Sequence, residues 1–262
     1  MTDKVITDAE LVNKFAQQAQ KEPESSIKTT APSKPLVTLP GGFINNGEVV
    51  TTAEVRELTG LDEEAIAKAP TTGKALNLLL QRGLVSIGSR EATLEDLDAL
   101  LSGDRDAILI GIRRNTFGDT VEFDLTCFNC NERQEISVHL KDDVPVRELG
   151  GKPRSWTVDT KRGPVEVALP TGITQKKLLE NADKTSAEIN TILLSGCVLS
   201  VNGMPSMGAS TVLQLGMADR SKIVDEIISR VPGPRLGEVV KTCKACGEEM
   251  ATPLSLVDLF SL

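Results

Sequence analysis

Four of the five cysteines in this sequence form two pairs with identical spacing. Cys127 and Cys130 stand in DLTCFNC, and Cys243 and Cys246 stand in VKTCKACGEE. A C-x-x-C pair can hold a metal ion, form a redox-active disulfide, or remain as two free thiols. Two such pairs facing each other would supply the four sulfurs of a tetrahedral structural zinc site.

The residues around each cysteine pair favour metal binding over redox chemistry. Both pairs stand between short stretches that we expect to be strands, whereas a redox pair is expected at a helix N-terminus, where the dipole lowers the thiol pKa. Asn131 follows the first pair and Gly247 the second, and both residue types tolerate the positive φ that a tight turn around an ion requires. We therefore predict one structural Zn²⁺. Its ligands would be Cys127, Cys130, Cys243 and Cys246. A redox pair, two separate sites and metal-free cysteines remain alternatives.

The rest of the sequence offers no set of residues typical of an active site. Four cysteine ligands leave zinc no open position, so the predicted site stabilises and does not catalyse. The stretch APTTGKA fails the P-loop pattern because Lys68 and Ala75 stand where Gly and Ser or Thr are required. His139 is the only histidine, tyrosine is absent, and Cys197 stands in an apolar segment and is expected to be buried. We predict a protein that is not an enzyme, with no small-molecule substrate.

Charge and hydropathy exclude further classes. The net charge of −8 over 262 residues does not favour nucleic-acid binding, which depends on Lys and Arg neutralising phosphates. The sequence has no run of about 18 apolar residues, so we expect no membrane span. The N-terminal residues do not resemble a secretory signal. We expect synthesis in the cytoplasm and no membrane partner.

The first 35 residues are predicted to be a flexible arm. Residues 7–21 have the periodicity of an amphipathic helix, and Thr7 and Glu10 have capping-box spacing. Residues 22–35 are rich in Pro, Ser, Thr and Lys and are expected to be an extended linker. The arm would either pack on its own domain or dock on a neighbouring subunit.

Residues 36–120 are predicted to form a helical domain with a short β-hairpin. Two strands are expected within 36–50 around an Asn-Gly turn. Short helices are expected to follow, with Thr51, Asp62 and Asp104 as cap residues. The predicted helices cover 53–59, 62–69, 72–82, 93–101 and 104–114.

The second half of the chain is predicted to split a zinc ribbon in two. Residues 121–149 are predicted to be the first half of the ribbon, because strands are expected before and after the first cysteine pair. Residues 236–262 would supply the second half and a C-terminal tail. Residues 150–235 would be an insertion with one β-hairpin and several helices. The predicted class is α+β, with helical domains joined to a small split zinc-ribbon β element and a flexible N-terminal arm.

Several stretches resemble the T4-type bacteriophage baseplate hub family. They are LPGGFINNGEVVTTAEVRELTGLDEEAIAKA, LEDLDALLSGDRDAILIGIRRNTFGDTVEFDLTCFNC and CKACGEEM, within residues 36–140 and 236–260. The resemblance implies a structural virion component in the tail baseplate, made in the host cytoplasm, with other phage tail and baseplate proteins as partners. The alternatives are a tail-assembly factor or chaperone absent from the finished particle, and a zinc-ribbon nucleic-acid-binding adaptor.

Overall fold

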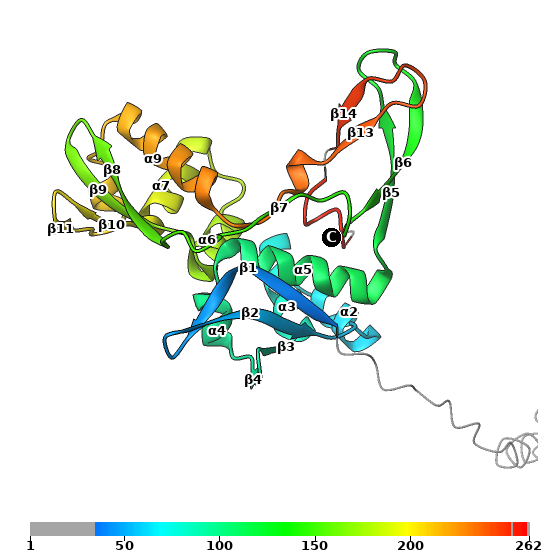
Figure 1. Cartoon of the computed structure of the whole chain (residues 1–262), viewed down its shortest axis with the longest axis horizontal. Helices are drawn as coiled ribbons and strands as arrows, with labels where there is room; N and C mark the ends of the chain where they lie inside the picture. Colours follow the sequence, from blue (N-terminus) through cyan, green and yellow to red (C-terminus); the bar gives the residue numbers. More distant parts are fainter. Residues whose placement is uncertain (1–34, 253, 261–262) are drawn as a thin grey trace, which may run out of the picture. The chain divides into compact units, whose positions relative to one another are not determined.

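The computed structural model describes residues 35–252 and 254–260 (Figure 1). The helix predicted at 7–21, and the linker predicted at 22–35 apart from Pro35, lie outside the described residues. The elements below all lie within residues 34–262. They combine helices with several small sheets, which confirms the α+β class.

The first sheet has four antiparallel strands in the order β1-β2-β3-β4. The predicted Asn-Gly turn is present, with Asn46 and Gly47 both at positive φ. The register of β1 shifts between Thr38 and Phe43, where the Pro-Gly-Gly stretch adds residues to the strand. The strands are β1 (Leu36–Asn45), β2 (Glu48–Val55), β3 (Leu84–Ile87) and β4 (Arg90–Glu91).

The helix predicted at 53–59 is wrong, because β2 occupies residues up to Val55. Ala53 and Val55 are buried and alternate with the less buried Glu54, which is the period of a strand. Ala53 pairs with Val37 on one side and Ile87 on the other. The capping-box spacing that begins at Thr51 therefore falls inside a central strand, where ladder hydrogen bonds prevail over the local signal.

Four helices pack with this sheet around a shared core of leucine and isoleucine side chains. The helices predicted near 62–69, 72–82, 93–101 and 104–114 are present. Their observed bounds are α2 (Gly60–Ala67), α3 (Thr72–Gly83), α4 (Leu94–Ala99) and α5 (Ser102–Phe117).

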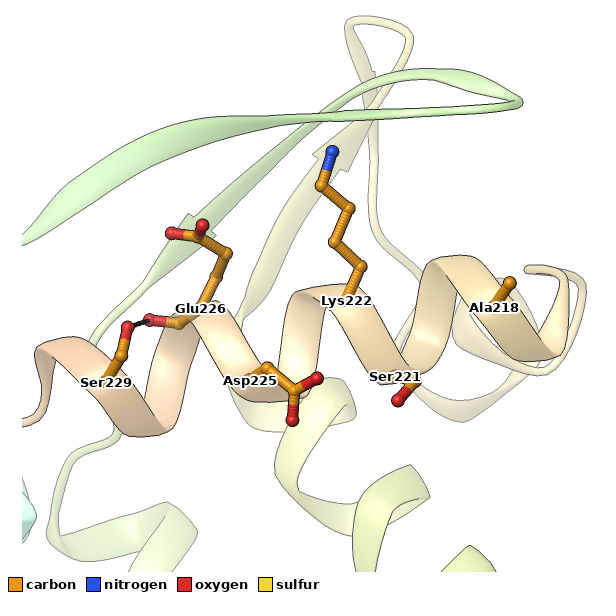
Figure 2. Close-up of a pocket in the computed structure, with 6 residues that line it drawn as sticks. All are labelled: Ala218, Ser221, Lys222, Asp225, Glu226 and Ser229. Atoms are coloured by element: carbon orange, nitrogen blue, oxygen red, sulfur yellow. Dashed lines mark hydrogen bonds between the residues drawn. The ribbon is translucent and has the colours of Figure 1, made fainter.

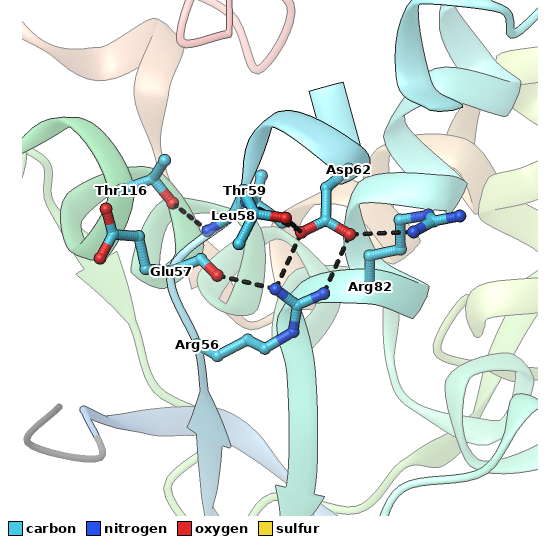
Figure 3. Close-up of polar contacts among 7 residues, drawn as sticks. All are labelled: Arg56, Glu57, Leu58, Thr59, Asp62, Arg82 and Thr116. Atoms are coloured by element: carbon cyan, nitrogen blue, oxygen red, sulfur yellow. Dashed lines mark hydrogen bonds and ion pairs between the residues drawn. The ribbon is translucent and has the colours of Figure 1, made fainter. Parts of the chain in front are cut away.

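Asp62 does not cap α2 as predicted; it is the third residue of the helix. Thr59 is the N-cap, and Asp62 completes the capping box by accepting from the Thr59 N–H at 2.9 Å. Asp62 also accepts from Arg56 at 2.8 and 3.0 Å and from Arg82 at 2.9 Å (Figure 3). Hydrogen bonds from Arg56 in particular lower the pKa of Asp62. One buried carboxylate thus joins the end of β2, the start of α2 and the end of α3.

Asp104 is likewise not a cap, because α5 begins at Ser102 with Leu101 as its N-cap. The Asp104 side chain is fully buried, and one of its oxygens accepts from the Gly41 N–H of β1 at 2.7 Å. Its other oxygen has no hydrogen-bond partner. Burial raises the pKa of Asp104 to about 7, although the Gly41 N–H and the Arg154 guanidinium oppose this.

The insertion between the cysteine pairs has its own sheet, in the order β11-β10-β9-β8, and its own core. The predicted hairpin and helices are present, and Cys197 is buried at the end of α7, where desolvation raises the pKa of its thiol to about 12. The hairpin β8–β9 passes over α9, which carries Lys222 (Figure 2). Lys222 donates to the Asp159 carbonyl at 2.7 Å. The elements are β8 (Ser155–Thr160), β9 (Gly163–Ala168), α6 (Gly172–Glu180), α7 (Ser186–Cys197), β10 (Val198–Val201), β11 (Met204–Pro205), α8 (Ala209–Val212) and α9 (Met217–Arg230).

Two further hairpins carry the cysteine pairs. The strand predicted to run from Leu236 to Cys243 instead starts as a 3-10 turn, η1 (Leu236–Glu238), which buries Leu236. The strand that precedes this turn in sequence, β12, pairs antiparallel with β7. The strands are β5 (Thr120–Thr126), β6 (Arg133–His139), β7 (Val146–Arg147), β12 (Gly233–Pro234), β13 (Val240–Thr242) and β14 (Glu249–Ala251).

Candidate metal centre

Two antiparallel hairpins, β5–β6 and β13–β14, place the two cysteine pairs in their turns. All seven residues of β5 pair with β6, from Thr120 with His139 to Thr126 with Arg133. The shorter β13 pairs with β14 from Val240–Ala251 to Thr242–Glu249. Side chains from both hairpins share one buried cluster, so hydrophobic packing holds the two turns near each other. The cluster includes Cys127, Ile136, Val138, Cys243 and Met250.

The two cysteine turns have the same backbone hydrogen bonds. The Cys127 N–H donates to the Glu132 carbonyl at 2.9 Å, and the Asn131 N–H donates to the Cys127 carbonyl at 2.9 Å. In the second turn, the same two positions relative to Cys243 form bonds of 2.8 and 2.9 Å. Asn131 has φ of 60° and Gly247 has φ of 77°, as predicted for the residue after each pair. Each turn therefore directs two sulfurs toward one side.

The structure brings together all four cysteines that the sequence singled out. Their sulfurs all lie within 4.8 Å of one another. The Cys127 and Cys246 sulfurs are 3.7 Å apart, as are those of Cys130 and Cys243. A tetrahedron with metal–sulfur bonds of about 2.3 Å has edges of about 3.8 Å. The two closest pairs thus join opposite hairpins at nearly the spacing that a shared ion requires, and the cluster could bind a metal ion.

Gln134 is the side chain at this site that the sequence analysis missed. Its amide nitrogen lies 3.0 Å from the Cys243 sulfur, and its carbonyl oxygen accepts from the Lys244 N–H at 2.9 Å. Gln134 belongs to β6, so its side chain bridges one hairpin to the turn of the other. N–H donors to ligand sulfurs fix ligand orientation in metal sites. The sequence carries no signal for this contact, because 109 residues separate Gln134 from Cys243.

The electrostatics of the cluster depend on its N–H donors. The backbone N–H of Cys246, and those of Ala245 and the Gln134 side chain, lower the pKa of Cys243 to about 6, although desolvation opposes them. At Cys130, the Glu132 N–H lowers the pKa, but desolvation and the other three sulfurs outweigh it and raise the pKa to about 12. Negative charge on neighbouring sulfurs is mutually repulsive, and a bound cation would compensate it. Metal binding would supply that cation and displace thiol protons.

Burial divides the cluster into an inner and an outer half. Cys127 and Cys243 are buried, whereas Cys130 and Cys246 are exposed at the ends of their turns. Four cysteine sulfurs would saturate a tetrahedral ion, so such a site stabilises the hairpins and leaves no coordination position for a substrate.

A family model described as T4 bacteriophage base plate protein matches residues 52–261. This match covers most of the chain, which therefore belongs to that family, and the resemblance noted in the sequence is confirmed. A comparison with the curated proteins gave no match, and neither did one with the solved structures.

Family membership points to a structural, non-enzymatic role in a bacteriophage baseplate, in the virion tail and in contact with other tail proteins. In the described part of the chain, no helix has the length and apolar character needed to cross a membrane.

Proposed function

We propose that this protein is a structural component of the baseplate hub of a phage tail, where it holds neighbouring subunits. The family match over residues 52–261 carries this proposal. The fold is compatible with it, because the small sheets and the helices pack on shared buried clusters, as suits a building block that must keep its shape. The segment before Pro35 would be the N-terminal arm that contacts a neighbour.

We further propose that one zinc ion, held by the four cysteines, joins the two hairpins as a split zinc ribbon. The sulfur spacing, the matching turns and the all-sulfur ligand set support zinc. Zinc with four thiolates adds about −2 to the charge of the site, which the N–H donors of the turns partly offset. The ion would add to the stability that the shared buried cluster and the Gln134 bridge already give the two hairpins.

The proposed domain boundaries follow the buried clusters. One cluster belongs to the sheet and helices of 36–120, and another belongs to the insertion of 150–235. A third is shared by 121–149 and 236–262, the two halves of the proposed ribbon, and also takes in Ile110 of α5. A small fourth cluster of Leu101, Leu149 and Leu169 connects the regions, so we propose them as distinct cores within one connected fold.

Quantitative mass spectrometry of purified phage particles tests the proposed role. A hub component is expected in every particle at a fixed number of copies, and electron microscopy of the tail should place it in the baseplate. A protein present during tail assembly but missing from finished particles would contradict the proposal and favour an assembly factor. Salt-sensitive binding to DNA would favour the nucleic-acid adaptor.

A further inference from the structure

The β5–β6 hairpin is a two-stranded sheet whose backbone register identifies the groups at its two edges (Figure 1). The Leu140 N–H donates to the Asp119 carbonyl at 2.9 Å, and the Cys127 N–H donates to the Glu132 carbonyl at 2.9 Å. Both bonds continue the ladder beyond its ends, so every second residue of β5 between them bonds to β6 through its N–H and C=O. The other residues of β5 direct these groups away from β6. They are Thr120, Glu122, Asp124 and Thr126.

The corresponding outward groups of β6 are already in use. The His139 N–H donates to the Asp143 carboxylate at 2.7 Å. Lys244, in the turn of the other hairpin, donates to the Glu135 carbonyl at 3.2 Å. The β6 edge is therefore occupied by the loop that follows the strand and by the second cysteine turn.

The outward groups of β5 have a partner only at the start of the strand, within the described part of the chain. Arg113 of α5 donates to the Thr120 carbonyl at 3.3 Å. From Glu122 onward, no hydrogen bond within residues 35–252 and 254–260 reaches an outward N–H or C=O of this strand. We name the outward backbone groups of Glu122, Asp124 and Thr126 the β5 edge.

The β5 edge lacks the usual devices that prevent another strand from pairing. Natural sheets protect an open edge with a proline, a lysine or a bulge. Residues 120–126 contain no proline and no lysine, and all seven pair with β6 without a shift of register. The edge is thus a regular template for one more strand.

Burial of the apolar face decreases across the hairpin toward the same edge. Ile136 and Val138 of β6 are 3% and 0% exposed. Their cross-strand partners on β5, Phe123 and Val121, belong to the same cluster but are only partly buried. A strand beside β5 would therefore cover these two side chains if it placed apolar residues on this face.

The opposite, solvent-exposed face determines the charge of such a strand. It carries the carboxylates of Glu122, Asp124 and Glu135, and the guanidinium of Arg133, which pairs with Asp124 at 2.5 Å. Three negative groups and one positive group leave a net charge of −2. Lysine or arginine beside Glu122 would be attracted, whereas a second copy of this edge would place carboxylates against carboxylates. The edge therefore favours a cationic strand over self-pairing.

We propose that the β5 edge binds an extended segment of another tail protein, in which apolar residues alternate with lysine or arginine. Added strands gain affinity from backbone hydrogen bonds and specificity from alternate side chains. The apolar residues would lie beside Val121 and Phe123, and the basic residues beside Glu122 and Asp124. The source of the segment, another tail protein, rests on the proposed function; its chemistry rests on the edge itself.

NMR of the purified full-length protein with a synthetic peptide tests this contact. The probe is a capped seven-residue peptide of alternating lysine and valine, and its control has glutamate in place of lysine. We expect the lysine peptide to bind at least 10-fold more tightly and to slow amide exchange with water at Glu122, Asp124 and Thr126 at least 10-fold. The amides of Phe123 and Leu125 already bond to β6 and should change little.

Two proline variants at one position of the ladder separate the two edges. Glu122 and Ser137 stand opposite each other, and both direct their N–H groups outward. Proline at either position keeps the β5–β6 bonds and blocks only its own edge. Glu122→Pro should weaken binding of the lysine peptide at least 10-fold, whereas Ser137→Pro, the matched control, should not. Circular dichroism would verify that both variants are folded.

A charge reversal tests the same edge without a change of backbone. Glu122→Lys, at an exposed position, should weaken binding of the lysine peptide and strengthen binding of the glutamate peptide. A lysine peptide that does not bind, or that binds without slowing exchange at the β5 edge, would overturn the proposal. Equal weakening by both proline variants would also overturn it, as would self-pairing of the protein through this edge without peptide. These results leave the assignment to the baseplate to the mass spectrometry of particles.

Discussion

The four clustered cysteines are expected to bind a metal ion, and the fifth, Cys197, is not. Replacing Cys243 by Ser should abolish metal binding, because this buried sulfur is within 3.7 Å of the Cys130 sulfur on the other hairpin. Elemental analysis should give one zinc per wild-type chain and almost none in the variant, with a loss of several kcal/mol of stability. Cys197→Ser is the control. Cys197 lies in another core, so this variant protein should still bind one zinc. Retention of a full equivalent of zinc by Cys243→Ser would contradict the site.

Gln134 should tune the affinity of the same site. Gln134→Ala removes an N–H donor to the Cys243 sulfur and the bond that its oxygen accepts from the Lys244 N–H. We expect metal affinity to fall about 10-fold, as measured by competition with a chromophoric chelator. Gln81→Ala, at an exposed position of α3, is the matched control. An unchanged metal affinity would show that the Gln134 side-chain amide does not contribute to metal binding.

Asp104 should make stability depend on pH with a sign opposite to that of most carboxylates. Its pKa is raised to about 7 in the folded protein, against about 4 for an ordinary Asp, so the folded state holds its proton over a range where the unfolded state has lost it. The contribution of Asp104 to stability is therefore fully present below about pH 4 and is lost as pH rises from there through 7. Between pH 5 and pH 8 the loss is on the order of 2 to 3 kcal/mol.

Asp104→Asn isolates this effect from other titrating groups. The variant should be more stable than the wild type at pH 8, and the advantage should shrink by about 2 kcal/mol at pH 5. Denaturant unfolding of both proteins at the two pH values measures it. Asp62, whose pKa is lowered by Arg56, stays ionised in this window and drops out of the difference. An advantage that does not vary with pH would contradict the burial argument.

At the scale of elements, α5 depends on a glycine contact. A Cβ on Gly103 would lie 1.6 Å from the Pro232 carbonyl oxygen, so the helix and the β12 segment touch backbone to backbone. Gly103→Ala should therefore cost at least about 2 kcal/mol of unfolding free energy. Gly237→Ala, where a Cβ meets nothing within 4 Å, should stay within about 0.5 kcal/mol. Thermal unfolding distinguishes the two, and equal stability of both variants would contradict this packing.

The elements also show where sequence patterns suffice. Helices α3 and α4, the β5–β6 hairpin and the turn residues Asn131 and Gly247 follow from local spacing and were predicted. The helix expected at 53–59 failed because Ala53 is a central-strand residue paired on both sides, and pairing partners are distant in sequence. Gln134 was missed for the same reason. Cysteines are an exception, because their chemistry implies partners wherever these lie.

At the scale of the molecule, removing residues 1–33 should separate folding from assembly. This cut keeps Pro35, whose carbonyl accepts from the Val55 N–H at 3.1 Å. We expect an unchanged melting temperature of the purified chain, because among the described residues the buried clusters involve positions from Val37 onward. Complementation of a phage lacking the gene should then give few complete tails. Normal tails from the shortened protein would remove the arm from the proposed function.

Cys130 and Cys243 stand 113 positions apart, and this separation sets an order of events during synthesis. At 5–20 residues per second, the ribosome needs roughly 6–20 s to deliver the second cysteine pair after the first. Much of the insertion emerges from the ribosome before the second pair is made, while the first pair supplies only half of the proposed ligands. The proposed zinc would therefore bind tightly only to a chain that extends past Cys246, and a truncated translation product would lack it.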